Sequence, residues 1–227
     1  MRAIRLKTEY LSDPIGVDFS APRLFWNCEG GIKQTAYEII AADDAGGILW
    51  SSGKVESSAM RTTWGGKAVL PETKVFWRIR LWDENGVCGA WSETAFETGI
   101  GVWNAEWITG NYKVDQKKCY PVDCFRKCFD AADVGKARLY ITACGLYEAR
   151  INGAKCGNFV MAPGHTDYRK RVQYQTIDVT ELLKSGRNEL TVQLADGWYR
   201  GSCGAWGIKN QYGTETKLLA QLEITCE

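Results

Sequence analysis

The sequence predicts an all-β protein made of two consecutive β-sandwiches. Short apolar and aromatic segments of strand length recur along the chain, and clusters of Gly, Asp, Asn and Ser separate them. No stretch shows a convincing helical period of apolar residues. With 227 residues, the chain has room for two modest domains, each with a core of its own. We place the boundary near residue 100 and expect domains at 1–100 and 101–227.

The first predicted domain is a run of short strands separated by turns. Its clearest strand is 75–82, where a period of two places four apolar residues on one face: Val75, Trp77, Ile79 and Leu81. Further strands are expected at 23–27, 36–40 and 48–50, with a hairpin turn at 83–86 and a return strand at 91–96. Strands at this spacing are typical of an all-β sandwich.

Two arginines on the other face of strand 75–82 are expected to stack on tryptophans. Arg78 and Arg80 are placed to lie over Trp82 or Trp91, as guanidinium groups do on aromatic faces. A surface of Trp and Arg side chains is also compatible with a ligand site. We favour a bracing role, because exposed cation–π pairs are frequent in proteins.

The second predicted domain has longer loops between its strands. Strands are expected at 125–129, 137–143, 187–196 and 217–226. The pair Asn152-Gly153 predicts a hairpin turn, because both residues tolerate positive φ. Residues 178–186 predict one short helical turn, with a capping residue, a leucine pair and a glycine stop. Strands with long loops and almost no helix indicate a jelly-roll-like sandwich.

The charge balance argues against a nucleic-acid or membrane partner. The 28 Lys and Arg residues face 27 acids and are scattered along the chain. No apolar run approaches the length of a membrane span. The N-terminal residues lack the apolar region and the cleavage site of a signal peptide, so we predict a cytoplasmic chain.

Nine cysteines and one histidine give little support to a metal site or a catalytic triad. The cysteine count is odd, and no Cys-x-x-Cys pair occurs. The nearest group, Cys119, Cys124 and Cys128, would need a distant fourth ligand to hold zinc, and we favour reduced thiols. His165 is the only possible histidine base, and its place beside Gly164 in a turn favours a structural or solvated role.

A candidate site lies where the apolar strand 187–196 runs into a polar loop. Acids, arginines and flat aromatic rings on two loops would form a polar surface at the rim of the sandwich. The candidates are Asp167, Tyr168 and Arg169 on one loop, and Asp196, Trp198, Tyr199, Arg200 and Trp206 on the other.

Residues 15–99 resemble a fibronectin type III-like domain. The resemblance rests on three motifs: Pro22-x-Leu-x-Trp26, Trp77-Arg-Ile-Arg-Leu-Trp82 and Trp91-Ser92. It implies a spacer or packing module.

The motifs of the second domain resemble the N-terminal β-sandwich region of bacterial α-L-rhamnosidases. They are Gly145-Leu-Tyr-Glu with Asn152-Gly153, Pro163-Gly-x-Thr-Asp-Tyr-Arg-Lys-Arg-Val-x-Tyr-Gln-Thr176, Asp178-Val-Thr-x-Leu-Leu and Asp196-Gly-Trp-Tyr-Arg-Gly201. The resemblance implies an inverting sugar hydrolase whose two carboxylates sit on a helical (α/α) catalytic domain. This chain shows no succession of amphipathic helices, so the region is expected to support that domain and to be inactive alone.

The resemblance also implies a possible carbohydrate site, because related sandwiches act as calcium-dependent rhamnose-binding modules. Sugar rings stack on Trp and Tyr, and their hydroxyls pair with carboxylates, arginines or a bound calcium ion. The candidate partner is a rhamnose-containing glycan, bound by the eight loop residues named above. The favoured alternative is structural, with the two loops held together by an Asp–Arg pair and aromatic packing.

Two other hypotheses remain open from the sequence. The chain is compatible with an interaction or adhesion-type pair of β-sandwiches, in which the aromatic residues form a protein interface. An autonomous glycosidase using Asp167 and Asp196 would need carboxyl groups about 6.5–9.5 Å apart, and we consider it the least favoured hypothesis.

Overall fold

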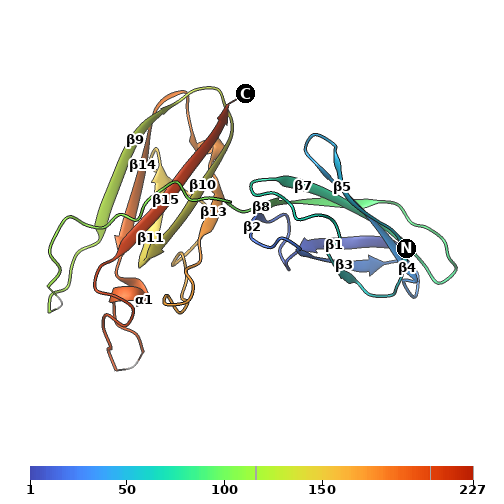
Figure 1. The fold of residues 1–227 in the computed structure, drawn as a ribbon, viewed down its shortest axis with the longest axis horizontal. Helices are drawn as coiled ribbons and strands as arrows, with labels where there is room; N and C mark the ends of the chain where they lie inside the picture. Colours follow the sequence, from blue (N-terminus) through green and yellow to red (C-terminus); the bar gives the residue numbers. More distant parts are fainter. Residues whose placement is uncertain (116, 205, 227) are drawn as a thin grey trace. The chain divides into compact units, whose positions relative to one another are not determined.

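The computed structural model describes residues 1–115, 117–204 and 206–226. The chain divides into two compact units, Met1–Val102 and Trp103–Glu227, and each unit is a β-sandwich (Figure 1). Among the described residues, the helices are η1 (Thr180–Leu182) and α1 (Gly197–Arg200). The predicted all-β fold is therefore confirmed.

The first sandwich packs a three-stranded sheet against a five-stranded sheet. The smaller sheet has the spatial order β1 (Arg2–Thr8), β3 (Arg23–Glu29) and β6 (Arg61–Thr63). The larger has the order β2 (Ile15–Val17), β8 (Ser92–Thr98), β7 (Lys74–Trp82), β4 (Ala36–Asp43) and β5 (Ile48–Glu56). Its strands pair antiparallel, except that β2 runs parallel to β8.

The core of the first sandwich confirms the period of two predicted for strand β7. Val75, Trp77, Ile79 and Leu81 are all fully buried. They pack against inward-facing residues of the opposite sheet, among them Leu24.

The outer face of β7 carries the predicted arginine–tryptophan ladder. The guanidinium of Arg78 lies 4.7 Å from the ring centroid of Trp91. Arg80 lies between Trp91, at 4.7 Å, and Trp82, at 5.2 Å, and it also forms an ion pair with Glu38. Both arginines therefore stack on tryptophan rings, as expected from the sequence, and Arg80 is also held by the neighbouring strand β4 through Glu38.

The second sandwich also has two sheets. One has the order β13 (Gln175–Asp178), β10 (Val134–Cys144) and β15 (Lys217–Cys226). The other has the order β12 (Ala154–Lys155), β11 (Leu146–Ile151), β14 (Gly186–Ala195) and β9 (Asp123–Ala131). An aliphatic core lies between them, with Leu139 and Ile141 from one sheet against Ile151 and Leu194 from the other.

Local structure in the second sandwich follows the predicted turns, with one difference. Asn152 and Gly153 take φ values of 51° and 84° and join β11 to β12 as a hairpin. The predicted helical turn is η1, whose first N–H, that of Thr180, donates to Asp178. Residues 197–200, expected as a loop, form the short helix α1 instead, stabilised by an (i, i+4) ion pair between Asp196 and Arg200.

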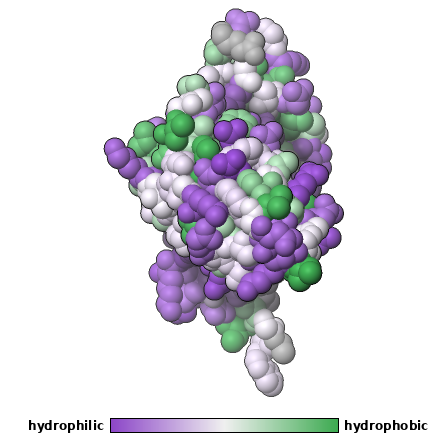
Figure 2. Space-filling model, turned by 90° about the vertical axis from the view of Figure 1, so that its right-hand side faces the viewer, coloured by the Kyte–Doolittle hydropathy of each residue, from purple (hydrophilic) through white to green (hydrophobic). Residues whose placement is uncertain are grey.

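The surface has ordinary polarity where it can be viewed. Figure 2 shows one face of the molecule, on which hydrophilic residues predominate and hydrophobic residues are scattered. Within the described part of the chain, no helix is both long enough and apolar enough to cross a membrane.

Candidate functional site

The candidate residues gather at one end of the second sandwich, around α1 (Figure 1). We call this end the rim, and among the described residues it comprises 112–115, 117–120, 163–174, 196–204 and 206–216. Strand β14 ends at Ala195, so Asp196 and α1 follow it directly at this end of the sheet. The rim contains two distinct features, an aromatic cluster and a polar pocket.

The aromatic cluster joins the two predicted loops. It consists of five rings: His165, Tyr168, Trp198, Tyr199 and Tyr212. The ring of Tyr168 lies 5.2 Å from Tyr199 and 5.1 Å from Tyr212, and His165 lies 5.5 Å from Trp198. Contacts at these distances stabilise by packing and ring electrostatics, so they fix the loop around residue 168 against α1.

The tyrosines of this cluster are used mainly for packing. The hydroxyl of Tyr168 donates to the backbone oxygen of Gly164 at 3.1 Å, and burial raises the pKa of Tyr168 to about 12. Burial also raises the pKa of Tyr199, and the Cys144 thiol beside its hydroxyl acts in the same direction. Both phenols therefore stay neutral near pH 7 and are not poised to act as bases.

Asp167 and Arg169 form a surface pair on the same loop. The Nε of Arg169 donates to Oδ1 of Asp167 at 2.9 Å, and the guanidinium lies 5.6 Å from the ring centroid of Tyr212. The hydrogen bond from Arg169 lowers the pKa of Asp167. Asp167 is thus a stable carboxylate at the edge of the aromatic cluster.

Asp196 and Arg200 form the second pair, and Arg200 is almost fully buried. The side chain of Arg200 is 5% exposed and directs both Nε, at 2.8 Å, and Nη2, at 2.6 Å, to Oδ1 of Asp196. Its Nη1 donates to the hydroxyl of Tyr112, which in turn donates to Asp123, as does Thr216. This network connects α1 to the beginnings of β9 and β15. It satisfies a buried charge that would otherwise be costly.

A polar pocket of about 190 Å³ opens beside this network. Both bonds from Arg200 go to Oδ1 of Asp196, and among the described residues no side chain is seen to donate to its Oδ2. Lys209 contacts Cys119 at 3.7 Å and has no carboxylate partner among the described residues. The lining is mostly polar and comes from three segments: Val114, Asp115, Lys118, Cys119, Tyr120, Asp196, Arg200, Gly201, Ser202, Lys209 and Asn210.

The structure divides the eight candidate residues among different places. Asp196 and Arg200 line the polar pocket, whereas Tyr168, Trp198 and Tyr199 belong to the aromatic cluster. Asp167 and Arg169 border the cluster. Trp206 is 89% exposed and makes no described ring contact. Aromatic contacts link the two loops, but each described Asp–Arg pair stays within its own loop.

Sequence reasoning did not find the partners that complete both features. Lys118 and Tyr120 of the pocket precede β9 and lie about 80 residues before α1, a separation that no local motif reveals. Tyr212 was missed as well, although it contacts three members of the aromatic cluster. The only indication in the sequence was that Tyr212 follows the candidates at 196–206 as a further aromatic residue.

The carboxylates of the rim do not form a metal site. Throughout the described residues, no group of three or more His, Cys, Asp or Glu side chains is arranged to hold a metal ion. Calcium prefers six to eight oxygen ligands, with several from carboxylates. Asp167 and Asp196 instead direct an oxygen each to an arginine, so the residues present do not fit calcium.

The fold and the rim define a class of protein: a pair of β-sandwich modules, the second of which carries decorated loops at one end. Two family models match the chain, one over most of each sandwich. Residues 3–101 match the Rha78A-like, N-terminal immunoglobulin domain, and residues 132–227 match the α-L-rhamnosidase N-terminal domain. The description of the first domain is immunoglobulin, and the fibronectin-like assignment stays a prediction.

Known proteins give the same result over nearly the whole chain. An α-L-rhamnosidase of Formosa agariphila is 35% identical over 96% of this chain and 26% of its own length. The solved α-L-rhamnosidases of Aspergillus terreus and Dictyoglumus thermophilum are each 32% identical, with TM-scores of 0.90 and 0.87 over 100% of this chain and 27% and 28% of theirs. The chain is the N-terminal region of an α-L-rhamnosidase-like protein, and it spans about a quarter of the length of these relatives.

Proposed function

We propose that this chain is a non-catalytic accessory region of an α-L-rhamnosidase. In this proposal it supports a helical catalytic domain of the same polypeptide and holds a single sugar at the rim of its second sandwich. The family assignment of both sandwiches supports the first part. The polar pocket beside α1 supports the second and is the observation that carries it.

The charges of the rim support placing catalysis elsewhere. An inverting glycosidase needs one carboxylic acid with a raised pKa and one carboxylate that activates water. The pKa of Asp167 is lowered by Arg169, so it cannot serve as the protonated acid near pH 7. Asp196 has one oxygen committed to Arg200. Asp167 therefore does not supply the protonated acid that inversion requires.

The size and chemistry of the pocket favour a monosaccharide. Its volume of about 190 Å³ is below the ~300–1,000 Å³ of sites for drug-sized ligands, so it suits one sugar ring. The Oδ2 of Asp196 offers an acceptor for a hydroxyl, and the Arg200 pair fixes its direction. Lys209, Ser202 and Asn210 also line the pocket and add hydrogen-bond donors. Because the relatives are α-L-rhamnosidases, L-rhamnose is the first ligand to test.

Calorimetric titration with L-rhamnose, with and without calcium, tests the proposal together with a chromogenic rhamnoside assay. We expect saturable heat, no turnover and no dependence on calcium. The variants Asp196→Asn and Lys209→Ala should each weaken binding about tenfold, because a hydrogen bond to a charged group contributes about 1.5 kcal/mol. Trp206→Ala, which removes an exposed ring outside the pocket, is the matched control.

The outcomes separate the parts of the proposal. Loss of binding in Trp198→Ala but not in Lys209→Ala would move the site to the aromatic cluster. An absence of heat with wild-type protein would leave a structural role only. Turnover by the chain alone would overturn the non-catalytic assignment.

We further propose that the chain works in the cytoplasm. All nine cysteines are free, and four of them, Cys88, Cys119, Cys124 and Cys226, are exposed. Exposed thiols persist in a reducing compartment and are oxidised outside it. Immunodetection after cell fractionation should find the protein in the cytoplasmic fraction, and recovery from the periplasm or the medium would contradict this.

A further inference from the structure

The outer face of the first sandwich's larger sheet carries a row of apolar side chains that crosses four neighbouring strands. From β8 through β7 and β4 to β5, the paired residues of this row are Ala95, Phe76, Ala42 and Ile48, and we call them the apolar strip. The strip lies on the face opposite the core, because the alternate residues Trp77 and Ala41 of the same strands are fully buried. Phe76 is 44% exposed and Ile48 is 72% exposed. A contiguous apolar row of this kind indicates an interaction surface rather than ordinary scattered exposure.

The strip alternates between small and large side chains. Its order across the sheet is alanine, phenylalanine, alanine, isoleucine. All four residues line a hollow of about 590 Å³ on this face. A two-fold axis that runs along the strands, between β7 and β4, places a second copy of the strip over the first with every large side chain above a small one. Phe76 of each copy then meets Ala42 of the other, and Ile48 meets Ala95.

A charged row on the same face fits the same axis. Two rows away from the strip, Arg80 of β7 forms an ion pair of 2.6 Å with Glu38 of β4. The axis exchanges β7 with β4, so Arg80 of each copy lies opposite Glu38 of the other. The two ion pairs then make a square of alternating charge. Such complementarity favours this pairing over other ways of stacking the two faces.

The row between the strip and these ion pairs is also compatible with the axis. From β8 to β5 it reads Glu93, Arg78, Ile40 and Ser51. The axis places Arg78 over Ile40, where the aliphatic stem of the arginine can pack. It places Glu93 over Ser51. Across these three rows of described residues, no two like charges lie directly opposite each other.

We propose that this face is a self-association surface, through which two copies of the chain pack sheet against sheet about the two-fold axis. Aligned sheets pack about 10 Å apart, so the side chains of each copy fill the hollow of the other. With strands about 4.8 Å apart and a rise of about 3.4 Å per residue, three rows on four strands cover roughly 400 Å² per copy. This footprint is small for a specific interface. The dimer is therefore weak and reversible, with a Kd of about 10–100 μM.

Sedimentation velocity of the 227-residue chain at increasing concentration tests the proposal. We expect a change from monomer to dimer between about 1 and 500 μM. Ile48→Ser should raise the Kd about tenfold, because the side chain would no longer bury apolar area in the dimer. Ile32→Ser is the matched control, since Ile32 is 91% exposed and lies outside the strip. It should leave the Kd unchanged.

An exchange of large and small residues makes the test specific to this geometry. Phe76→Ala leaves the opposing hollow empty, and Ala42→Phe sets two rings against each other. Each change alone should remove the dimer from the measured range. The double variant Phe76→Ala/Ala42→Phe again pairs one large residue with one small residue and should restore association. Thermal melting checks that all three variants are folded, and a purely structural role of Phe76 would not be rescued in this way.

The other outcomes overturn the proposal. A wild-type chain that stays monomeric at about 500 μM would leave this face for another partner, such as a further domain of a longer polypeptide. Dimers that Ile48→Ser does not weaken would place self-association elsewhere on the molecule. Dimers that Ile48→Ser weakens but that the exchange of residues 42 and 76 does not restore would overturn the two-fold packing between β7 and β4.

Discussion

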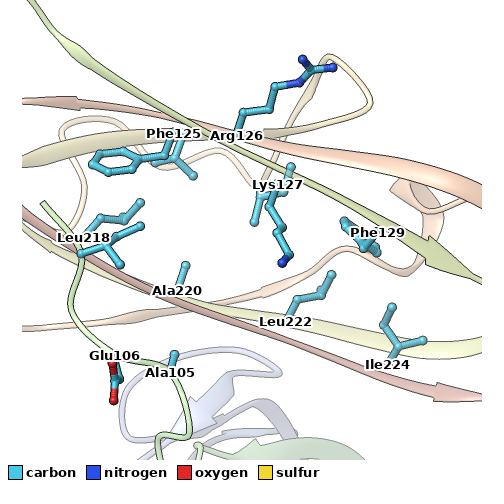
Figure 3. A pocket seen from close by; sticks show the side chains of 13 residues that line it. Ala105, Glu106, Phe125, Arg126, Lys127, Phe129, Leu218, Ala220, Leu222 and Ile224 are labelled. Atoms are coloured by element: carbon cyan, nitrogen blue, oxygen red, sulfur yellow. The ribbon is translucent and has the colours of Figure 1, made fainter. Parts of the chain in front are cut away.

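The two sandwiches bury their cores in different ways. The first uses large aromatic residues, with Trp26, Trp64 and Trp77 buried between its sheets. Each indole N–H donates a hydrogen bond: Trp26 to Gln34, Trp64 to the backbone of Lys67, and Trp77 to Thr8. The second uses small and aliphatic residues and leaves a row of them half-buried along an apolar groove between β9 and β15 (Figure 3).

This difference separates a core closed by hydrogen-bonded indoles from an aliphatic core that is less fully covered. Buried indoles span from one sheet to the other and satisfy their polar atoms inside the core, so the first sandwich is specified by its own sequence. The second has the apolar groove beside β9 and a loop-rich end, where the polar pocket lies. The proposed sugar site therefore falls on the second sandwich.

A pair of leucine substitutions measures how open the second sandwich is. Leu139 is fully buried in β10, whereas Leu222 is half-buried beside the groove. We expect Leu139→Ala to lower the free energy of unfolding by about 2–5 kcal/mol. Leu222→Ala should cost about 1 kcal/mol, because less apolar area returns to water and no closed cavity forms.

Urea unfolding with pulse-labelling hydrogen exchange reports each sandwich separately and is the measurement for both variants. The first sandwich is the internal control, since its peptides should keep the wild-type midpoint. Equal losses at Leu139 and Leu222 would show that the groove is closed in solution and would remove the contrast between the two sandwiches.

The sequence predicted individual strands and turns better than it predicted which of them lie side by side. The alternation of β7 and the Asn152-Gly153 turn depend on neighbouring residues, and both were correct. Helix α1 was expected as a loop, because Gly197 and two aromatic residues are poor helix formers and the pairing of Asp196 with Arg200 decides the conformation.

The pocket and the groove depend on which strand ends meet, and this information is not local. Tyr120 reaches α1 only because β9 lies beside β14 in the sheet. Lys127 appeared in the sequence as an ordinary member of an alternating strand. Its place in the lining of the groove depends on β15, which lies about 90 residues later in the chain and forms the other wall.

The smallest expected effect concerns acid stability, and it belongs to the first sandwich. Hydrogen bonds from Arg23 lower the pKa of Glu9, whose carboxylate receives the backbone N–H of Arg23 at 2.6 Å and its Nη2 at 2.5 Å. A carboxylate whose pKa is lowered in the folded state stabilises the fold above the unfolded pKa of about 4.3, and this stabilisation is lost as the pH falls through the folded pKa.

Glu9→Gln should therefore lower the urea midpoint of the first sandwich at pH 7 and leave it nearly unchanged near pH 2.5. The effect should be smaller than that of Leu222→Ala, because Arg23 is 47% exposed and solvent screens the pair. Glu56→Gln, in the exposed pair with Lys54, is the matched control; an equal effect there would assign the acid sensitivity to net charge.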